Sequence, residues 1–336
     1  MWHQDFQRSP AVLELFKEVS WLIFVIIKIF FMYDTIIIGG GPAGVSAGVY
    51  AARKKMKTLF ITENFGGQST VSTDIGNWIG HVSISGLELA KSLEAHLKAQ
   101  EDIEVREGEA AKQVTKLDAG FQVKTTKGVY ETKTVIVCAG ARHRQLNVPG
   151  EREFSSRGVA YCSTCDAPLF RGRAMAVIGG GNSGLEAVAD LLPYASEIHL
   201  LNYTDKIKGD PTTLEKIQAS DKFKGVIYNA ETLEILGDKT VTGLKYKDRQ
   251  SGEEKTLPVQ GIFVEIGAVP NSELVKGLVE LNSYGEIVLD HRTAATSVPG
   301  IFAAGDVTDE AFKQNNISAG DGVKAALSAY QYLQDK

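Results

Sequence analysis

A glycine-rich hexapeptide with the spacing G-x-G-x-x-G occurs twice in this chain of 336 residues. The first copy, Gly39–Gly44, and the second, Gly179–Gly184, begin 140 residues apart, and each follows a short apolar run. In such a motif the first glycine permits a tight turn, the second lets the backbone approach a pyrophosphate, and the third lets a helix pack closely on a strand. The N-terminus of that helix then faces the anion. Two copies in this context predict two dinucleotide-binding units in one chain.

The segments around each copy have the hydrophobic pattern of a βαβ unit. Apolar runs at Thr35–Ile38 and Ala174–Ile178 predict buried parallel strands that end in the glycines. A helix and a second strand are predicted to follow each run, at 43–55 and 57–62 in the first unit and at 183–192 and 197–201 in the second. Further helices are expected at 87–100 and 317–333, and further strands at 121–126, 129–137, 261–266 and 300–304. The fold class is therefore α/β, with two Rossmann-like units in series.

Composition excludes several other kinds of protein. Charged residues make up 23% and hydrophobic residues 43% of the chain, which is a globular mixture rather than a disordered one. The formal charge of −5 leaves no basic excess to neutralise a phosphate backbone, so we expect no nucleic-acid partner. Three cysteines cannot form a disulfide scaffold, and a reducing, cytoplasmic location is the default expectation.

An acidic side chain about 20 residues after the first glycine of such a motif binds the ribose hydroxyls of the nucleotide. Glu63 stands 24 positions after Gly39, at the end of a predicted strand, and fits an adenosine ribose. The equivalent position of the second unit is Asn202, which carries no charge, and no arginine cluster is nearby to bind a 2′-phosphate. The second cofactor is expected to be a nicotinamide nucleotide, with the choice between NADH and NADPH open and a preference for NADH. Two such sites suggest electron transfer between NAD(P)H and a flavin.

Cys162 and Cys165 form a C-x-x-C motif shortly before the second glycine motif. Such a pair can be half of a structural zinc site, which has four ligands, but the other cysteine is Cys138 and the six histidines show no paired spacing, so no metal site is predicted. The alternative is a redox dithiol, because the spacing permits a disulfide and can depress one thiol pKa. Asp166 follows directly and is a candidate proton carrier or a helix cap. Cys138 lies in an apolar run and is expected to be a buried small hydrophobe.

From Tyr33 to Lys336 the chain resembles the low-molecular-weight thioredoxin reductases, and among them the catalytic part of the flavoprotein subunit of alkyl hydroperoxide reductase. Six segments carry the resemblance in order and spacing: IIIGGGPAG, FGGQ, YCSTCDAPLF, VIGGGNSGLEA, GIFVEIGAVPN and GIFAAGDV. It implies a fold of the pyridine nucleotide-disulfide oxidoreductase type, with an FAD-binding domain split between 32–147 and 267–336. An NAD(P)H-binding domain at 148–266, which carries the dithiol, is inserted. Where the family motif continues Cys-Asp-Gly, this chain has Ala167, a replacement that bears on the turn beside the redox pair.

The resemblance implies an FAD-dependent NAD(P)H:disulfide oxidoreductase that passes electrons from the nicotinamide to FAD, to the disulfide and then to a thioredoxin-like protein. It also implies a homodimer, and domains that rotate so that dithiol and nicotinamide alternate at the flavin. The catalytic residues would be Cys162, Cys165 and Asp166, with Cys165 as the flavin-side sulfur. The motifs and the resemblance together assign cofactor binding to Gly39, Gly41, Pro42, Ala43, Gly44, Glu63, Gly67, Gln68, Asn77, Gly179, Gly181, Asn182, Ser183, Gly184, Asn202, Gly305, Asp306 and Gln314.

Other functions stay open. An NAD(P)H oxidase or diaphorase would pass electrons to oxygen or a one-electron carrier and leave the dithiol unused. A peroxiredoxin-linked reductase would need a separate carrier protein, because residues 1–31 are too few for the N-terminal C-x-x-C module of that system. A redox sensor or membrane-tethered binding module would have no catalytic role.

The N-terminal segment gives two further expectations. Val19–Met32 is largely apolar over 14 residues, shorter than the roughly 20 that a membrane-spanning helix needs, and it lacks the basic flank of a secretory signal. Residues 1–31 are therefore interpreted either as an over-extended start ahead of Met32 or as an anchor, with membrane association through residues 11–32.

Overall fold

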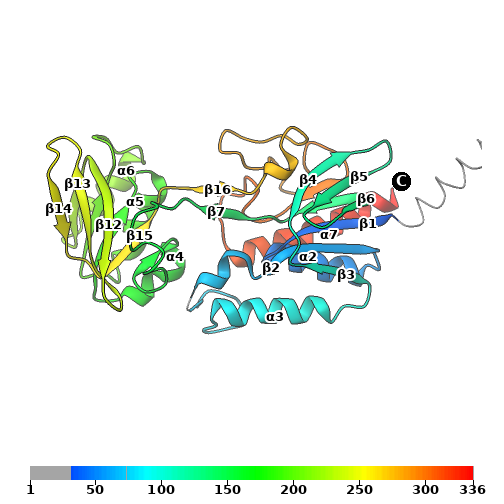
Figure 1. The fold of residues 1–336 in the computed structure, drawn as a ribbon, viewed down its shortest axis with the longest axis horizontal. Helices are drawn as coiled ribbons and strands as arrows, with labels where there is room; N and C mark the ends of the chain where they lie inside the picture. The colour runs from blue at the N-terminus through cyan, green and yellow to red at the C-terminus, as the bar shows by residue number, and fades with distance from the viewer. Residues whose placement is uncertain (1–31, 73, 336) are drawn as a thin grey trace, which may run out of the picture.

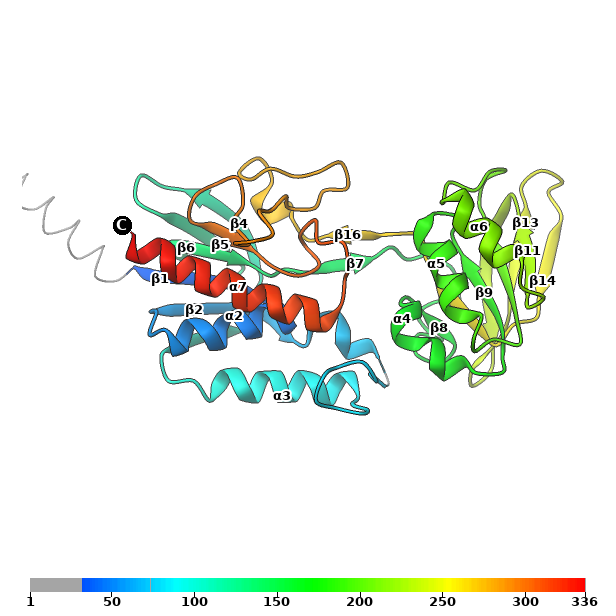
Figure 2. The same ribbon diagram turned by 180° about the vertical axis from the view of Figure 1, so that it is seen from behind.

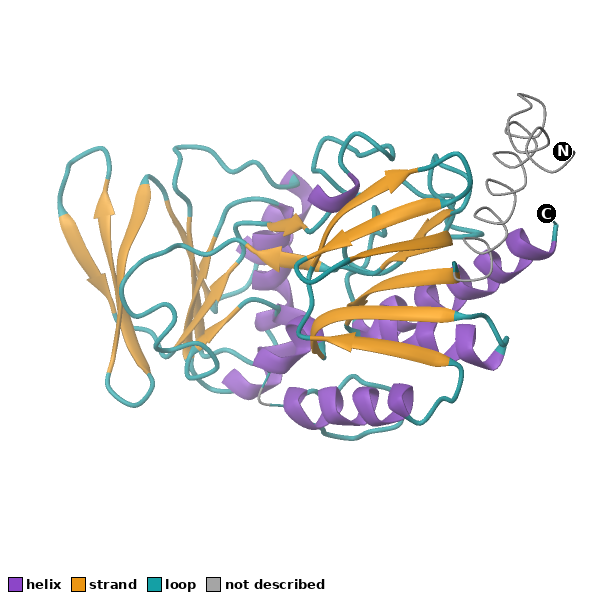
Figure 3. Cartoon of the chain, turned by 45° about the vertical axis from the view of Figure 1, so that its right-hand side comes forward, coloured by secondary structure: helices purple, strands orange, loops and turns teal. Residues whose placement is uncertain are grey.

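The computed structural model describes residues 32–72 and 74–335, which form two lobes (Figure 1). Two short strands, β7 (Ala141–His143) and β16 (Ala268–Pro270), pair antiparallel and join the lobes. The chain therefore leaves the first lobe at β7 and returns to it at β16. These crossings lie beside the domain limits expected at 147/148 and 266/267, which stay predictions. Figure 3 shows the strands of the two lobes as separate sheets.

The first lobe is built on a seven-stranded sheet with the order β3-β2-β1-β6-β5-β4, and β17 also pairs with β6. Its centre is parallel, because β1 pairs in parallel with β2 and β6, whereas β4, β5 and β6 are antiparallel. Ile36, Ile37 and Phe60 have no exposed surface, as expected for strands covered on both faces. The strands are β1 (Tyr33–Gly40), β2 (Thr58–Phe65), β3 (Ile103–Glu107), β4 (Ala111–Lys116), β5 (Phe121–Thr125), β6 (Val129–Val137) and β17 (Ile301–Ala303).

Three α-helices cover this sheet: α2 (Pro42–Arg53), α3 (Gly86–Lys98) and α7 (Asn315–Gln334). Helix α7 packs along α2 (Figure 2). The approach is close because Gly322 has no side chain, and a Cβ atom there would lie 2.0 Å from the carbonyl oxygen of Ala43. This contact places the segment before α7 beside the first glycine motif. Two 3₁₀ helices, Gly67–Val71 and Glu273–Val275, complete the lobe.

The second lobe holds a five-stranded parallel sheet with the order β11-β10-β9-β15-β8 and an antiparallel sheet with the order β12-β13-β14. Its strands are β8 (Val159–Ala160), β9 (Ala174–Ile178), β10 (Glu197–Leu201), β11 (Phe223–Ile227), β12 (Ala230–Gly237), β13 (Val241–Asp248), β14 (Glu254–Leu257) and β15 (Gly261–Val264). Its helices are α4 (Ser163–Asp166), a 3₁₀ helix (Ala167–Phe170), α5 (Asn182–Leu191) and α6 (Pro211–Gln218).

The helices and strands expected from the sequence are confirmed, with ends within three residues of the predicted ones. The antiparallel sheet β12-β13-β14 was not predicted. The expected anchor and the over-extended start both concern residues 1–31, which lie outside the described residues. Within 32–72 and 74–335, no helix is both long and apolar enough to cross a membrane.

Candidate active site

The three glycines of the first motif have different surroundings, as the roles predicted from their spacing require. Gly39 has a φ of +118°, and a Cβ atom there would lie 2.1 Å from the carbonyl oxygen of Cys138. A Cβ atom at Gly44 would lie 1.8 Å from the carbonyl oxygen of Gly39, so this glycine permits the helix to pack on the strand end. Among the described residues, no neighbouring atom lies within 4 Å of the Cβ position of Gly41. It is also the N-cap of α2, with no side-chain cap, so the helix N-terminus faces open space that an anion can fill.

The second motif repeats this geometry. Gly179 has a φ of +126°, and a Cβ atom there would lie 2.2 Å from the carbonyl oxygen of Glu265. A Cβ atom at Gly184 would lie 1.8 Å from the carbonyl oxygen of Gly179, and no atom of the described residues lies within 4 Å of the Cβ position of Gly181. Gly181 is the N-cap of α5, also without a side-chain cap. Both motifs therefore fit the pyrophosphate of a dinucleotide.

A cavity of about 580 Å³ opens beside the first motif, a volume typical of small-molecule sites. Gln68, which lines it, donates a hydrogen bond to the carbonyl oxygen of Ala141. Asp306 accepts one from the Ser318 hydroxyl at 3.2 Å, and burial raises the pKa of this carboxyl. The predicted site residues that line the cavity are Gly39, Gly41, Pro42, Ala43, Glu63, Gly67, Gln68, Gly305 and Asp306.

Two of the polar side chains that line this cavity and were not predicted from the sequence are Glu109 and Asn271. Glu109 is only 2% exposed and accepts a hydrogen bond from the Thr125 hydroxyl. Asn271 donates to the carbonyl oxygen of Ala139 at 2.7 Å and so ties the β16 region to the end of β6. Asn271 ends one of the segments that carried the family resemblance, and this was its only sequence signal.

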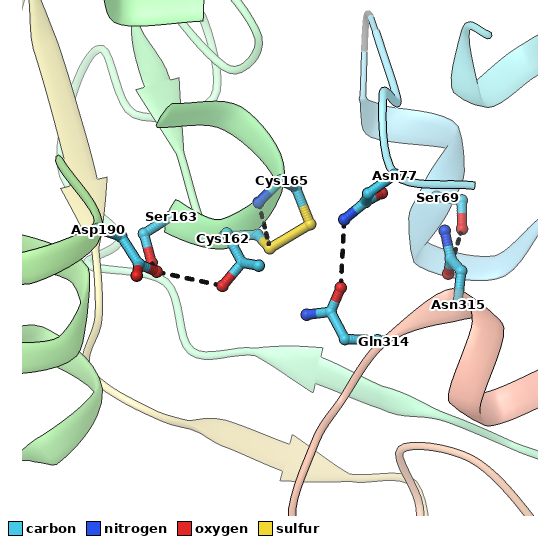
Figure 4. Close-up of a disulfide and its surroundings, with 9 residues drawn as sticks. Ser69, Asn77, Cys162, Ser163, Cys165, Asp190, Gln314 and Asn315 are labelled. Carbon is cyan, nitrogen blue, oxygen red and sulfur yellow. Dashed lines mark hydrogen bonds between the residues drawn. A yellow bond between two sulfur atoms is a disulfide. The ribbon is translucent and has the colours of Figure 1, made fainter. Parts of the chain in front are cut away.

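Cys162 and Cys165 form a disulfide at the start of α4. Figure 4 shows the disulfide opposite Asn77 and Gln314 of the first lobe, whose side chains share a hydrogen bond of 3.3 Å. Neither Asn77 nor Gln314 lines the cavity. The second lobe thus presents its redox pair to two of the predicted FAD-binding residues.

Asp166, which ends α4, is partly buried, and burial raises the pKa of its carboxyl to about 6. Its side chain caps no helix, which removes the capping interpretation and leaves the carboxyl available for proton transfer. Ala167 has φ −50° and ψ −42°, a right-handed helical conformation that needs no glycine. The replacement of the family glycine therefore leaves the turn unstrained. Among the described residues, no group of His, Cys, Asp or Glu could hold a metal ion.

At the end of β10, Asn202 is 7% exposed, and its side-chain amide donates to the carbonyl oxygens of Thr204 and Lys206, both at 2.9 Å. It therefore holds the loop that follows the strand. The guanidinium of Arg249 lies over the Tyr203 ring, 4.0 Å from its centroid, and donates to the Tyr203 carbonyl oxygen at 3.1 Å. Arg249 was missed because it lies 46 residues from Tyr203 in the sequence.

Each glycine motif forms a phosphate cradle, that is, a helix N-terminus that has no side-chain cap and faces open space. The lobe with the second cradle also carries the Cys162–Cys165 disulfide. Together these features define the fold of a nucleotide-dependent disulfide oxidoreductase. Residues 33–326 match the family model described as pyridine nucleotide-disulphide oxidoreductase. The chain belongs to this family, whose thioredoxin reductase-like members use FAD and NAD(P)H. The geometry of both cradles fits these two cofactors.

Two curated relatives each match 90% of this chain. One is the "NADH dehydrogenase" of Bacillus subtilis, 47% identical over 302 residues. The other is an alkyl hydroperoxide reductase subunit from Xanthomonas campestris pv. phaseoli, 43% identical over 305 residues. The chain spans only 58% and 57% of their respective lengths.

Among solved structures, the thioredoxin reductase of Streptococcus pyogenes is 34% identical, with a TM-score of 0.85 over 91% of this chain and 99% of that one. The thioredoxin reductase of Giardia duodenalis is 30% identical, with a TM-score of 0.84 over 90% of this chain and 99% of that one. The match over nearly the whole of these chains confirms the predicted fold class.

Proposed function

We propose that this chain reduces the disulfide of a thioredoxin-like protein with electrons from NAD(P)H. The observation that carries the proposal is the Cys162–Cys165 disulfide, which the second lobe presents to Asn77 and Gln314 of the first lobe (Figure 4). Bound FAD supplies a two-electron carrier between the nicotinamide and this disulfide. The first cradle and Glu63 would hold FAD, and the second cradle would hold the nicotinamide nucleotide.

The reduced pair then works by thiol–disulfide exchange. A thiolate of the pair attacks the partner disulfide, which forms a mixed disulfide and releases one partner thiolate. The other cysteine attacks the mixed disulfide, re-forms the Cys162–Cys165 bond and releases the second partner thiolate. In sum, NAD(P)H, one proton and the partner disulfide give NAD(P)⁺ and the partner dithiol. We assign Cys165 to the flavin side, since Figure 4 draws its sulfur toward Asn77.

Asp166 would hold the proton that this exchange moves. Its pKa of about 6 lets the carboxyl take up and give back a proton near neutral pH, which a carboxyl with an ordinary pKa does poorly. Burial is the cause of the raised pKa. The position directly after Cys165 places the carboxyl on the same short helix as the redox pair.

The proposal extends to partner, nicotinamide and assembly. The relative named as an alkyl hydroperoxide reductase subunit supports either a thioredoxin-like partner or a separate carrier that serves a peroxiredoxin. A relative named NADH dehydrogenase, together with the neutral Asn202, supports NADH as the preferred nucleotide. A homodimer, a cytoplasmic location and rotation between the lobes belong to the same proposal.

One observation favours a second function. The relative named NADH dehydrogenase is 47% identical, which supports an NADH oxidase or diaphorase that passes electrons to an acceptor other than a protein disulfide. In that case the Cys162–Cys165 pair would take no part in turnover.

An anaerobic titration of the FAD-loaded protein separates the two functions. We expect uptake of four electrons per FAD, because the disulfide and the flavin each take two, and reoxidation by a thioredoxin disulfide. Cys162→Ser and Cys165→Ser should keep FAD, take up two electrons and lose NAD(P)H-driven disulfide reduction, whereas Cys138→Ser serves as the matched control. Full disulfide reduction by both variants, or two-electron uptake by the native chain, would refute the reductase.

A further inference from the structure

One acidic side chain, that of Asp190, binds the turn between Cys162 and Cys165, which we call the redox turn. Ser163 and Thr164 are the two residues between the cysteines, and their hydroxyls donate to the same oxygen, Oδ2 of Asp190, at 2.8 and 3.2 Å. Figure 4 shows Asp190 reaching Ser163 from α5, on the side of α4 away from Asn77. The Ser163 residue is 8% exposed. The turn between the two sulfur atoms is therefore anchored by its side chains to a second helix.

A neighbouring strand adds a third contact to the same turn. The carboxyl of Glu265, which directly follows β15, lies close enough to the backbone N–H of Ser163 for this N–H to lower the pKa of the carboxyl. Burial, with a further contribution from the negative charges of Asp190 and Glu186, raises the pKa of Glu265 to about 8. Two carboxyl groups, one on α5 and one at the end of β15, thus face the turn, and Asp190 accepts hydrogen bonds from both of its hydroxyls.

Because Asp190 lies on α5, its contact links the redox turn to the second glycine motif. Helix α5 begins at the second glycine motif, whose open N-terminus fits the nicotinamide nucleotide. The residues that bind the nucleotide and the residue that holds the redox turn therefore stand on one helix of ten residues. A disulfide re-forms readily only when its two thiols are kept near bonding distance, because pre-organisation removes the entropy cost of bringing them together.

We propose that Asp190 is a positioning residue for the redox pair: by holding the Ser163–Thr164 turn on α5, it keeps the two thiols together in the reduced state and so favours disulfide formation. The inference rests on the proposed function only in taking Cys162–Cys165 as a redox pair. Loss of the anchor should make the disulfide easier to reduce, since the freed dithiol closes less readily.

The test measures the reduction equilibrium of the pair without nicotinamide or partner. The FAD-loaded chain is equilibrated anaerobically with reduced and oxidised dithiothreitol, quenched with acid, denatured and alkylated, and the alkylated cysteines are counted by mass. Cys138 is alkylated in every sample, so the oxidised form shows one modified cysteine and the reduced form three. Hydrogen–deuterium exchange of the 162–167 segment, on the oxidised protein, reports the looseness of the turn.

Asp190→Ala removes the acceptor and should raise the equilibrium constant for reduction by about tenfold, which equals about 30 mV for a two-electron couple. Exchange in 162–167 should become faster. Asp190→Asn keeps an acceptor oxygen and should restore both values to near the native ones. Glu215→Ala, which removes an exposed carboxylate from α6 of the same lobe, is the matched control and should match the native chain.

Ser163→Ala removes only the shorter hydrogen bond and should shift the equilibrium by about threefold in the same direction. If Asp190→Ala does not fold, Ser163→Ala still tests the proposal. A native equilibrium in both Asp190→Ala and Ser163→Ala would overturn the proposal, as would an equal shift in Asp190→Asn, because the effect would then come from charge. If the native chain fails to reduce any thioredoxin-like disulfide, the proposed function falls while these equilibria still decide the role of Asp190.

Discussion

The two glycine motifs have the same backbone and different surroundings. In each, a carbonyl oxygen lies about 2 Å from the Cβ position of the first glycine, at 2.1 and 2.2 Å, and the second glycine faces open space. The carbonyl belongs to Cys138 in the first lobe and to Glu265 in the second. On the next strand of the first unit, the exposed Glu63 lines a cavity, whereas Asn202, directly after the next strand of the second unit, is buried and holds a loop. The backbone of both motifs therefore fits a dinucleotide, and the motifs differ in the side chains around them.

The two motifs differ most clearly in the residue whose carbonyl oxygen lies against the first glycine, which is Cys138 in the first motif and Glu265 in the second. Cys138 is 5% exposed, and burial raises the pKa of its thiol, so it stays protonated and unreactive beside the first motif. Burial raises the pKa of Glu265 to about 8, and this carboxyl lies near the redox turn. The residue behind the first motif thus carries an inert thiol, whereas the residue behind the second carries a titratable carboxyl.

The largest expected effect comes from filling the open position of each motif. Gly41 and Gly181 have φ values of −77° and −90°, which any residue adopts, and in the part of the chain that the structure describes no atom lies within 4 Å of their Cβ positions. Gly41→Val and Gly181→Val should therefore fold, while the new side chain takes the space of the pyrophosphate. We expect roughly 100-fold weaker binding of the cofactor concerned, since overpacking a close contact costs up to about 3 kcal/mol.

The two variants should fail differently. Gly41→Val should be purified without flavin, measured by absorbance at 450 nm, whereas Gly181→Val should keep FAD and lose reduction by NAD(P)H. Loss of flavin from Gly181→Val, with the secondary structure unchanged by circular dichroism, would contradict the assignment of the two motifs to different cofactors.

A smaller effect is expected from Glu63 and Asn202, which lie near the end of the second strand of each unit. Glu63→Gln removes a charged acceptor for ribose and should weaken FAD binding by about tenfold, without changing the KM for NADH. Asn202→Asp replaces an amide donor by a carboxylate that faces the carbonyl oxygens of Thr204 and Lys206. It should raise the KM for NADH and NADPH alike by about tenfold and leave FAD binding unchanged. An equal effect of both variants on FAD would show that the comparison between Glu63 and Asn202 is wrong.

Sequence alone predicted the parts of the site that depend on backbone chemistry. Glycine spacing, the apolar runs and the C-x-x-C pair are local patterns, and the structure bears out the helices and strands drawn from them. The contacts of Asp190 and Arg249 were not predictable, because they span 27 and 46 residues and depend on which face of a helix or hairpin packs against the turn. Likewise, the sequence did not predict that the side-chain amide of Asn202 donates its hydrogen bonds to the loop that follows it.

The smallest effect concerns the pH dependence of stability. Glu265 has a pKa of about 8 in the folded chain against an ordinary value of 4.5, so the folded state holds a proton that the unfolded state releases between these values. Stability should therefore fall as the pH rises from about 4.5 to 8. Glu265→Gln removes this loss and should raise the melting temperature at pH 8.5 by about 2–4 °C, with no change at pH 4. Glu215→Gln, at an exposed position, should leave the slope unchanged. If the melting curves of Glu265→Gln and the native chain stay parallel across this range, the carboxyl does not hold the proton, and the contrast with the inert Cys138 is lost.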